Sequence, residues 1–154
     1  MATRWLTKEQ QRSWRAYIEA IRLLQDSLDA QLQTEADMPH AYYEILVRLS
    51  EAPDRRLRMA ELATGTQSSR SRVSHAVARL EERGWVRREP CASDRRGQLA
   101  VLTEDGLAAL ADAAPGHVAR VRATVIDALS PEQLRALGDA SVAIANAVRA
   151  TGCD

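Results

Sequence analysis

The chain has 154 residues, of which 45% are hydrophobic and 27% charged, a composition typical of a folded globular protein. No stretch approaches the roughly 18 uncharged apolar residues of a membrane span. The first residues lack the apolar core of a secretory signal, so we expect a cytoplasmic protein. Two cysteines, Cys91 and Cys153, are too few for a disulfide framework. The length suits one domain that folds without disulfides or a structural metal.

Arginine is concentrated in the middle of the chain, although the formal net charge of the whole is zero. Residues 55–96 contain 11 arginines and 5 acidic residues, so this segment carries +6 and the remainder −6. Such a surface can simply be solvated. The planar guanidinium, however, forms the paired hydrogen bonds that recognise phosphate and guanine, which lysine cannot form. The distribution therefore favours nucleic-acid binding over a merely solvated face.

The first two elements are predicted to be helices. Thr7 and Gln10 fit a capping box at the start of the first helix, and apolar residues then recur at three- and four-residue steps as far as Leu32. Residues 37–39 end this helix, and Pro39 fits the first turn of a second helix that ends near Glu51. The long apolar stripe of the first helix needs a partner to cover it.

A short helix over 59–64, Gly65, and a longer helix over 68–83 predict a helix-turn-helix. Gly84 fits the left-handed residue that ends such a helix. Residues 85–89 and 98–102 predict two strands, joined by a polar loop over 90–97. A helix-turn-helix followed directly by a β-hairpin is a winged helix.

Two further helices are expected after the hairpin. One starts at residues 103–105 and carries an apolar stripe from Leu107 to Val125, and Pro115-Gly116 should kink or break it. Residues 130–133 form a second capping box, and the last helix runs to about Arg149. The predicted fold class is mainly α with a small β-hairpin wing: a winged helix-turn-helix with long terminal helices.

Three motifs accompany this order of elements. Residues 69–88 (SRSRVSHAVARLEERGWVRR) are followed by Asp94-Arg95-Arg96-Gly97 and then by Leu102-Thr103-Glu104-Asp105-Gly106. In sequence and spacing they resemble the recognition helix, the Asp-x-Arg wing and the Leu-Thr-x-x-Gly helix opening of the MarR (multiple antibiotic resistance regulator) family. Residues 59–63 match the preceding short helix, although Arg58 stands where a Ser or Thr cap is common.

The resemblance covers nearly the whole chain. It implies a homodimeric transcriptional regulator, usually a repressor, that binds a pseudo-palindromic site in double-stranded DNA. It also implies a single domain over 1–154, with a DNA-binding winged-helix lobe at 39–103. Residues 1–38 and 104–154 would then form a helical dimerisation lobe.

The residues expected to contact DNA lie on the longer helix of this lobe and in the wing. On a helical wheel, Val73, Val77 and Leu80 point one way, and the polar side chains point outward or to the flanks. Such a helix can bury one face and lay the other in a major groove, where arginine can bind guanine O6 and N7. The predicted helix contacts are Ser68, Ser69, Arg70, Ser71, Arg72, Ser74, His75 and Arg79.

The wing contributes Asp94, Arg95 and Arg96. Asp94 is expected to hold an arginine or the loop backbone rather than to touch DNA, because phosphate repels a carboxylate. By resemblance to the family, Arg96 enters a minor groove and Arg95 contacts phosphate. A solvated turn is the alternative.

Regulation by a small molecule is a further expectation. In the family, small, often phenolic or other aromatic, ligands bind between the dimer helices and the winged helix. The matching positions here are Trp14, Tyr17, His40 and Tyr43, which could equally be core or interface aromatics. Redox regulation through Cys91 is the alternative, although peroxide-sensing relatives carry their cysteine near the start of the first helix, where this chain has none.

Enzymatic and metal-binding functions find no support in the sequence. It contains no dinucleotide-binding loop, Walker motif or Gly-x-Ser-x-Gly elbow. His40, His75 and His117 are single residues on separate elements, without a ligand at metal-binding spacing. We therefore predict no catalytic activity, cofactor or metal. A winged-helix protein-interaction module is the alternative class, which the arginine-rich face disfavours.

Overall fold

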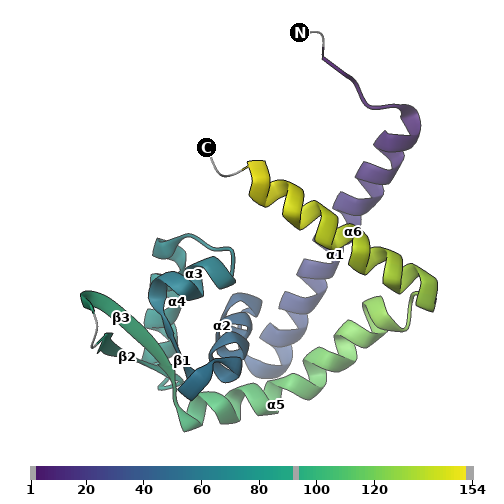
Figure 1. Cartoon of the computed structure of the whole chain (residues 1–154). Coiled ribbons are helices and arrows are strands. Elements are labelled where there is room, and N and C mark those ends of the chain that lie inside the picture. Colours follow the sequence, from purple (N-terminus) through teal and green to yellow (C-terminus); the bar gives the residue numbers. More distant parts are fainter. Residues whose placement is uncertain (1–2, 92–93, 152–154) are drawn as a thin grey trace. The chain divides into compact units, whose positions relative to one another are not determined.

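A computed structural model describes residues 3–91 and 94–151, with side chains placed for all of them except residues 94–96. Two compact units make up the chain, the first ending at His117 and the second beginning at Val118. Its elements, labelled in Figure 1, are α1 (Lys8–Ala36), α2 (His40–Glu51), β1 (Arg56–Arg58), α3 (Met59–Gly65), α4 (Arg70–Glu82), β2 (Val86–Cys91), β3 (Asp94–Leu102), α5 (Glu104–Val121) and α6 (Pro131–Thr151). This mainly helical fold with a small sheet confirms the predicted fold class.

The first two helices begin and end where the local sequence predicts. At the start of α1, the Gln10 N–H donates to Thr7 Oγ1 at 3.2 Å, and the Thr7 N–H donates to Gln10 Oε1 at 2.9 Å. Asp37 ends α1 in the left-handed conformation, with φ of 46°. Asp29 of α1 then accepts the His40 N–H at 2.9 Å, which ties the start of α2 back to α1.

The core of the first unit is formed by one apolar face from each of its helices, together with the inner face of the sheet. Its helical residues come from α1, α2, α3, α4 and α5, and residues of β2 and β3 complete it. The fully buried members are Leu32, Met38, Leu46, Leu49, Leu62, Val77, Leu80 and Ala100. Packing against this core fixes the orientation of α4 relative to the sheet.

The sheet has three antiparallel strands among the described residues, in the order β1-β3-β2. Val86 of β2 lies opposite Leu102, and Arg56 of β1 lies opposite Val101. The wing strands extend farther than predicted, since β2 reaches Cys91 and β3 already begins at Asp94. The sequence did not predict β1, whose three residues become a strand only by pairing with β3.

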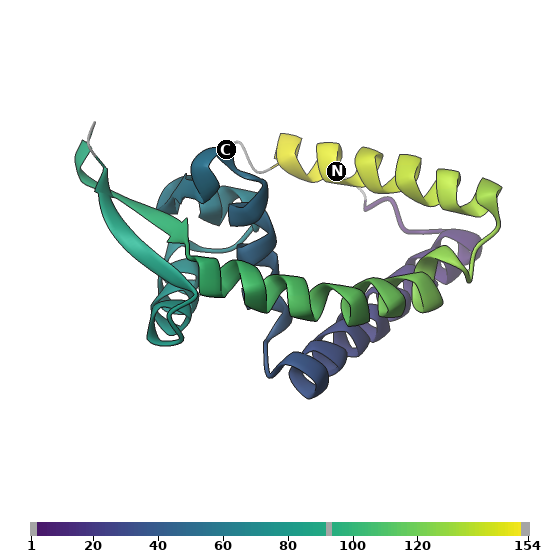
Figure 2. The same cartoon turned by 90° about the horizontal axis from the view of Figure 1, so that it is seen from below.

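The junction between β3 and α5 explains the Leu-Thr-x-x-Gly motif. Thr103 donates its N–H to the Trp85 carbonyl at 3.0 Å and its hydroxyl to the Gly84 carbonyl at 2.7 Å, and it caps α5 by accepting the Gly106 N–H at 3.0 Å. A Cβ on Gly106 would overlap the Trp85 carbonyl and lie 2.8 Å from Leu102 Cδ1. The motif therefore fixes α5 against the turn that follows α4, and Figure 2 shows α5 continuing directly from β3.

Pro115-Gly116 is predicted to kink or break the following helix, and the structure shows no break there. α5 continues through Pro115 to Val121, and a π-helical turn over Arg122–Ile126 follows. A Cβ on Gly116 would overlap the Glu35 carboxylate and lie 2.9 Å from Gln31 Nε2. Gly116 thus allows α5 to lie close to α1.

In the second unit, α6 begins as predicted with a capping box. The Gln133 N–H donates to Ser130 Oγ at 3.2 Å, and the Ser130 N–H donates to Gln133 Oε1 at 2.9 Å. No helix among residues 3–91 and 94–151 is both long enough and apolar enough to cross a membrane.

We expect Gly106→Ala to lower the free energy of unfolding by about 1–3 kcal/mol, because the new methyl group meets a backbone carbonyl that cannot move aside. Denaturant unfolding followed by circular dichroism measures this change. Gly138→Ala in α6 is the matched control, because a Cβ there meets nothing within 4 Å. It should be neutral or stabilise by up to about 1 kcal/mol. Equal stability of the two variants would contradict this account of the motif.

Candidate nucleic-acid interface

The turn before α4 determines which of the predicted serines remain available. Ser69 is the N-cap of α4, and its Oγ accepts the Arg72 N–H at 3.3 Å. Ser68 was predicted to lie within the helix but precedes it. Its N–H donates to the Ala63 carbonyl at 3.0 Å and its hydroxyl to the Thr66 carbonyl at 3.3 Å. Ser68 therefore ties the turn to α3.

The outward face of α4 is polar and basic, as the helical wheel predicts. Val73, Val77 and Leu80 are buried. The exposed predicted residues on the opposite side and flanks are Arg70, Ser71, Arg72, Ser74, His75 and Arg79. One side of a single helix thus presents three arginines, two hydroxyls and an imidazole, which can donate hydrogen bonds to phosphates and base edges.

Three of these exposed side chains are already engaged within the chain. Ser71 Oγ lies within hydrogen-bond distance of Ser69 Oγ, at 3.2 Å. Arg79 Nη1 donates to Glu82 Oε2 at 2.8 Å, and this carboxylate raises the pKa of Arg79 above its ordinary value. Ser74 accepts hydrogen bonds from Arg88 of β2. By contrast, Arg70 and Arg72 at the start of α4 form no ion pair with any residue whose side chain is described.

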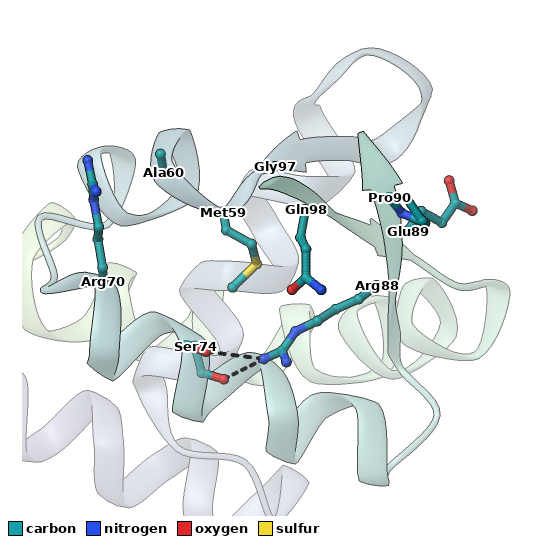
Figure 3. A pocket seen from close by; sticks show the side chains of 9 residues that line it. All are labelled: Met59, Ala60, Arg70, Ser74, Arg88, Glu89, Pro90, Gly97 and Gln98. Atoms are coloured by element: carbon teal, nitrogen blue, oxygen red, sulfur yellow. Dashed lines mark hydrogen bonds between the residues drawn. The ribbon is translucent and has the colours of Figure 1, made fainter. Parts of the chain in front are cut away.

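A hollow of about 490 Å³ lies between α4 and the wing, with Arg88 reaching across it toward α4 (Figure 3). The guanidinium Nη2 of Arg88 donates to the Ser74 carbonyl at 2.7 Å. Met59, Arg70 and Gln98 also line the hollow. Sequence reasoning did not single out Arg88, because the seven and fourteen residues that separate it from Glu81 and Ser74 match no local pattern.

The wing arginines can be placed only by their backbone. Asp94, Arg95 and Arg96 belong to β3, and Cys91 at the end of β2 lies opposite Asp94. The predicted contacts of these three side chains fall outside the described part of the structure.

The C-terminal end of α4 is also held by an arginine, Arg83. Arg83 Nη1 donates to the Asp37 carbonyl at 2.7 Å, and its Nη2 lies 3.4 Å from the Asp37 carboxylate. The same guanidinium stacks over Trp85, with 4.9 Å between Cζ and the ring centroid. Arg83 therefore joins the end of α4 to the residue that ends α1.

The four residues predicted to bind a ligand fall into two separate pairs within the chain. Trp14 and Tyr17 lie together on α1, with ring centroids 6.2 Å apart, beside a surface hollow lined by α1 alone. His40 and Tyr43 line a different hollow of about 330 Å³, which His117 of α5 completes. The chain by itself does not bring the two pairs together.

His40 and His117 are not isolated, as the sequence suggested, but form a cluster with Tyr43. The His117 ring centroid lies 4.4 Å from that of Tyr43 and 5.6 Å from that of His40. Burial lowers the pKa of His117, and the neighbouring His40 lowers it further. Its buried Nδ1 has no hydrogen-bond partner among the described residues. Within residues 3–91 and 94–151, no group of three or more His, Cys, Asp or Glu side chains could hold a metal ion.

Comparisons with known proteins agree on one family. The MarR family model matches residues 36–97. The MarR family transcriptional regulator Sco3205 of Streptomyces coelicolor, solved in complex with DNA, is 57% identical, with a TM-score of 0.92 over 94% of this chain and 91% of that one. AbsC of the same organism, also a MarR family transcriptional regulator, is 49% identical, with a TM-score of 0.91 over 96% and 99%.

A more distant structure, an Escherichia coli MarR mutant complexed with operator DNA, shares the fold at 20% identity, with a TM-score of 0.77 over 92% of this chain and 99% of that one. No curated protein gives a significant match. Identity of 57% and 49% over almost the full length, together with the three motifs and the winged helix, shows that this chain belongs to the MarR family of transcriptional regulators.

Proposed function

We propose that the protein is a cytoplasmic transcriptional regulator that binds double-stranded DNA as a homodimer. The observation that carries this proposal is the one-sided burial of α4, which leaves Arg70, Arg72 and His75 exposed on a helix of the right size for a major groove. The DNA complex of the 57% identical Sco3205 supports the same function.

In this mechanism α4 lies in the major groove, and its N-terminal end supplies the base contacts. Arg70 and Arg72 have no ion pair within the described side chains, so each can form the forked contact to guanine. Arg79 is held by Glu82 and is better placed to add charge than to read bases. The wing, with Arg95 and Arg96, would contact the neighbouring backbone and minor groove.

We expect Arg72→Ala, or Arg70→Ala, to weaken binding to the DNA site that the wild type prefers by about 1–3 kcal/mol. Each change should also relax the sequence preference at one position of that site. Arg96→Ala should weaken binding with a changed preference mainly at flanking A·T positions. Selection from a randomised duplex pool, followed by titration of each variant, measures both effects. Unchanged affinity in all three correctly folded variants would contradict the assignment.

Homodimerisation is proposed from apolar surface that the single chain leaves uncovered. Residues 1–38 and 104–154 would form the dimerisation lobe. The exposed apolar residues in these segments are Trp5, Leu6, Trp14, Leu23, Val118, Leu137, Val142, Ile144 and Val148. Two-fold symmetry would place two copies of α4 about one DNA turn, roughly 34–36 Å, apart on a pseudo-palindromic site.

We expect sedimentation to show a dimer at micromolar concentration, and Val142→Glu to weaken it by placing a charge on uncovered apolar surface. Ser141→Glu introduces the same charge at the neighbouring exposed position of α6 and is the control. A folded monomer in the wild type, or binding to one half-site as tight as to the whole site, would exclude the dimer.

The protein is further proposed to be a repressor that a small aromatic molecule releases from DNA. The hollow of His40, Tyr43 and His117 supports this, because it combines aromatic rings with the buried Nδ1 of His117, which has no hydrogen-bond partner among the described residues. A tenfold loss of DNA affinity needs a coupling free energy of only about 1.4 kcal/mol.

We expect small aromatic molecules such as phenols, and not peroxide, to release the protein from DNA. Comparing His40→Ala with Trp14→Ala separates the two hollows, and loss of the response in one variant alone identifies the hollow that binds the ligand. Cys91→Ser combined with Cys153→Ser is the redox control. Release by peroxide that this double variant abolishes, with no response to any aromatic, would assign regulation to Cys91.

A further inference from the structure

Arg88 joins the wing to α4 through both its backbone and its side chain. Its N–H donates to Glu81 Oε1 at 3.0 Å, and its Nε lies 3.4 Å from Glu81 Oε2. Seven residues before Glu81 in α4, Ser74 receives the other end of the side chain. Nη2 of Arg88 donates to the Ser74 carbonyl at 2.7 Å and lies 3.4 Å from the Ser74 hydroxyl (Figure 3). Because Ser74 and Glu81 are seven residues apart, these contacts span roughly two turns, about 10 Å, of α4.

The neighbouring arginine on the same strand behaves differently. Arg87 points to the other face of β2, as successive residues of a strand do, and pairs with Glu89 of its own strand at 2.8 Å. Its side chain is 55% exposed, compared with 26% for Arg88. Arg88 is therefore held against α4: its Nη2 donates to Ser74, and its buried Nε has no hydrogen-bond partner among the described residues but faces the Glu81 carboxylate at 3.4 Å.

We propose that Arg88 is a positioning residue that fixes the wing against α4, and that DNA affinity depends on it through Glu81 and Ser74 rather than through a phosphate contact. This inference rests on the proposed DNA-binding function. The helix and the wing must reach neighbouring grooves of one duplex, so an unfixed wing would have to be ordered during binding, at a cost in affinity.

Replacing Glu81 tests the proposal, because a positioning role and simple charge repulsion predict opposite changes in DNA affinity. Replacing a carboxylate with an amide on a DNA-binding surface removes repulsion from phosphate and should raise affinity. If Glu81 holds Arg88, the same replacement loosens the wing and lowers affinity instead. Glu82 is the matched control, because it is the next residue, carries the same charge and pairs with Arg79 rather than with the wing.

The experiment measures binding of the full chain to a duplex that the wild type selects from a randomised pool, over about 50–200 mM salt. Folding of each variant is checked by thermal unfolding. We expect Glu81→Gln to weaken binding at least about fivefold, and Glu82→Gln to leave it unchanged or tighter. Glu81→Gln should have no weakening effect when Arg88→Met is already present.

Arg88→Lys provides a second, independent readout. A phosphate contact survives this change because lysine keeps the charge, so affinity and salt dependence would stay near those of the wild type. A positioning role is lost, because an ammonium group cannot keep the planar contacts to both Ser74 and Glu81. We therefore expect Arg88→Lys to bind about as weakly as Arg88→Met.

Two results would overturn the proposal: Glu81→Gln binding as tightly as Glu82→Gln, or Arg88→Lys retaining wild-type affinity. If Arg88→Met does not fold, the comparison of Glu81 with Glu82 decides alone. Failure of the wild type and of Glu82→Gln to bind any duplex would refute the proposed function itself, and with it the role of Arg88. If instead the wild type and Glu81→Gln bind equally well, the DNA-binding function stands and only the role of Arg88 is refuted.

Discussion

The orientation of α4 depends on the burial of three side chains, Val73, Val77 and Leu80, which are 0–2% exposed. At 100° per residue these positions share one side of the helix, so their burial fixes its rotation. Each contributes about 1.5–3 kcal/mol relative to an exposed position. A rotation that buried Arg72 instead would lose this and add the larger cost of an unpaired buried charge. The core behind α4 thus determines which side of the helix is exposed.

The arginines around α4 differ in what holds them, which a count of charges does not reveal. Between residues 55 and 88, six arginines pair with carboxylates whose side chains are described: Arg55, Arg56, Arg79, Arg83, Arg87 and Arg88. These surface pairs contribute little stability individually, but each restricts where a guanidinium can point. The arginines without such a pair at the start of α4 keep their donors available. In the proposed function, some arginines of the basic segment would therefore hold the structure together and others would contact DNA.

Local patterns predicted the presence of each helix and the capping boxes of α1 and α6, because capping and apolar periodicity act within a few residues. The predictions failed where contacts between residues far apart in the sequence determine the structure. The strand β1 forms only by pairing with β3. Pro115 does not end α5, because buried residues before it and the close packing of Gly116 on α1 hold the helix together. The contact of His40 with His117 joins residues 77 positions apart.

The proposed coupling between ligand binding and DNA binding would act through α4. Arg83 ties its C-terminal end to Asp37, the residue that ends α1, and His40 begins α2 three residues later. The orientation of α4 is therefore linked to the geometry where α1 meets α2. A ligand in the hollow of His40 and His117 can alter DNA affinity only by its differential affinity for two such geometries. The roughly 1.4 kcal/mol needed for a tenfold change is no more than the net value of one hydrogen bond to a charged group, such as that from Arg83 to the Asp37 carbonyl.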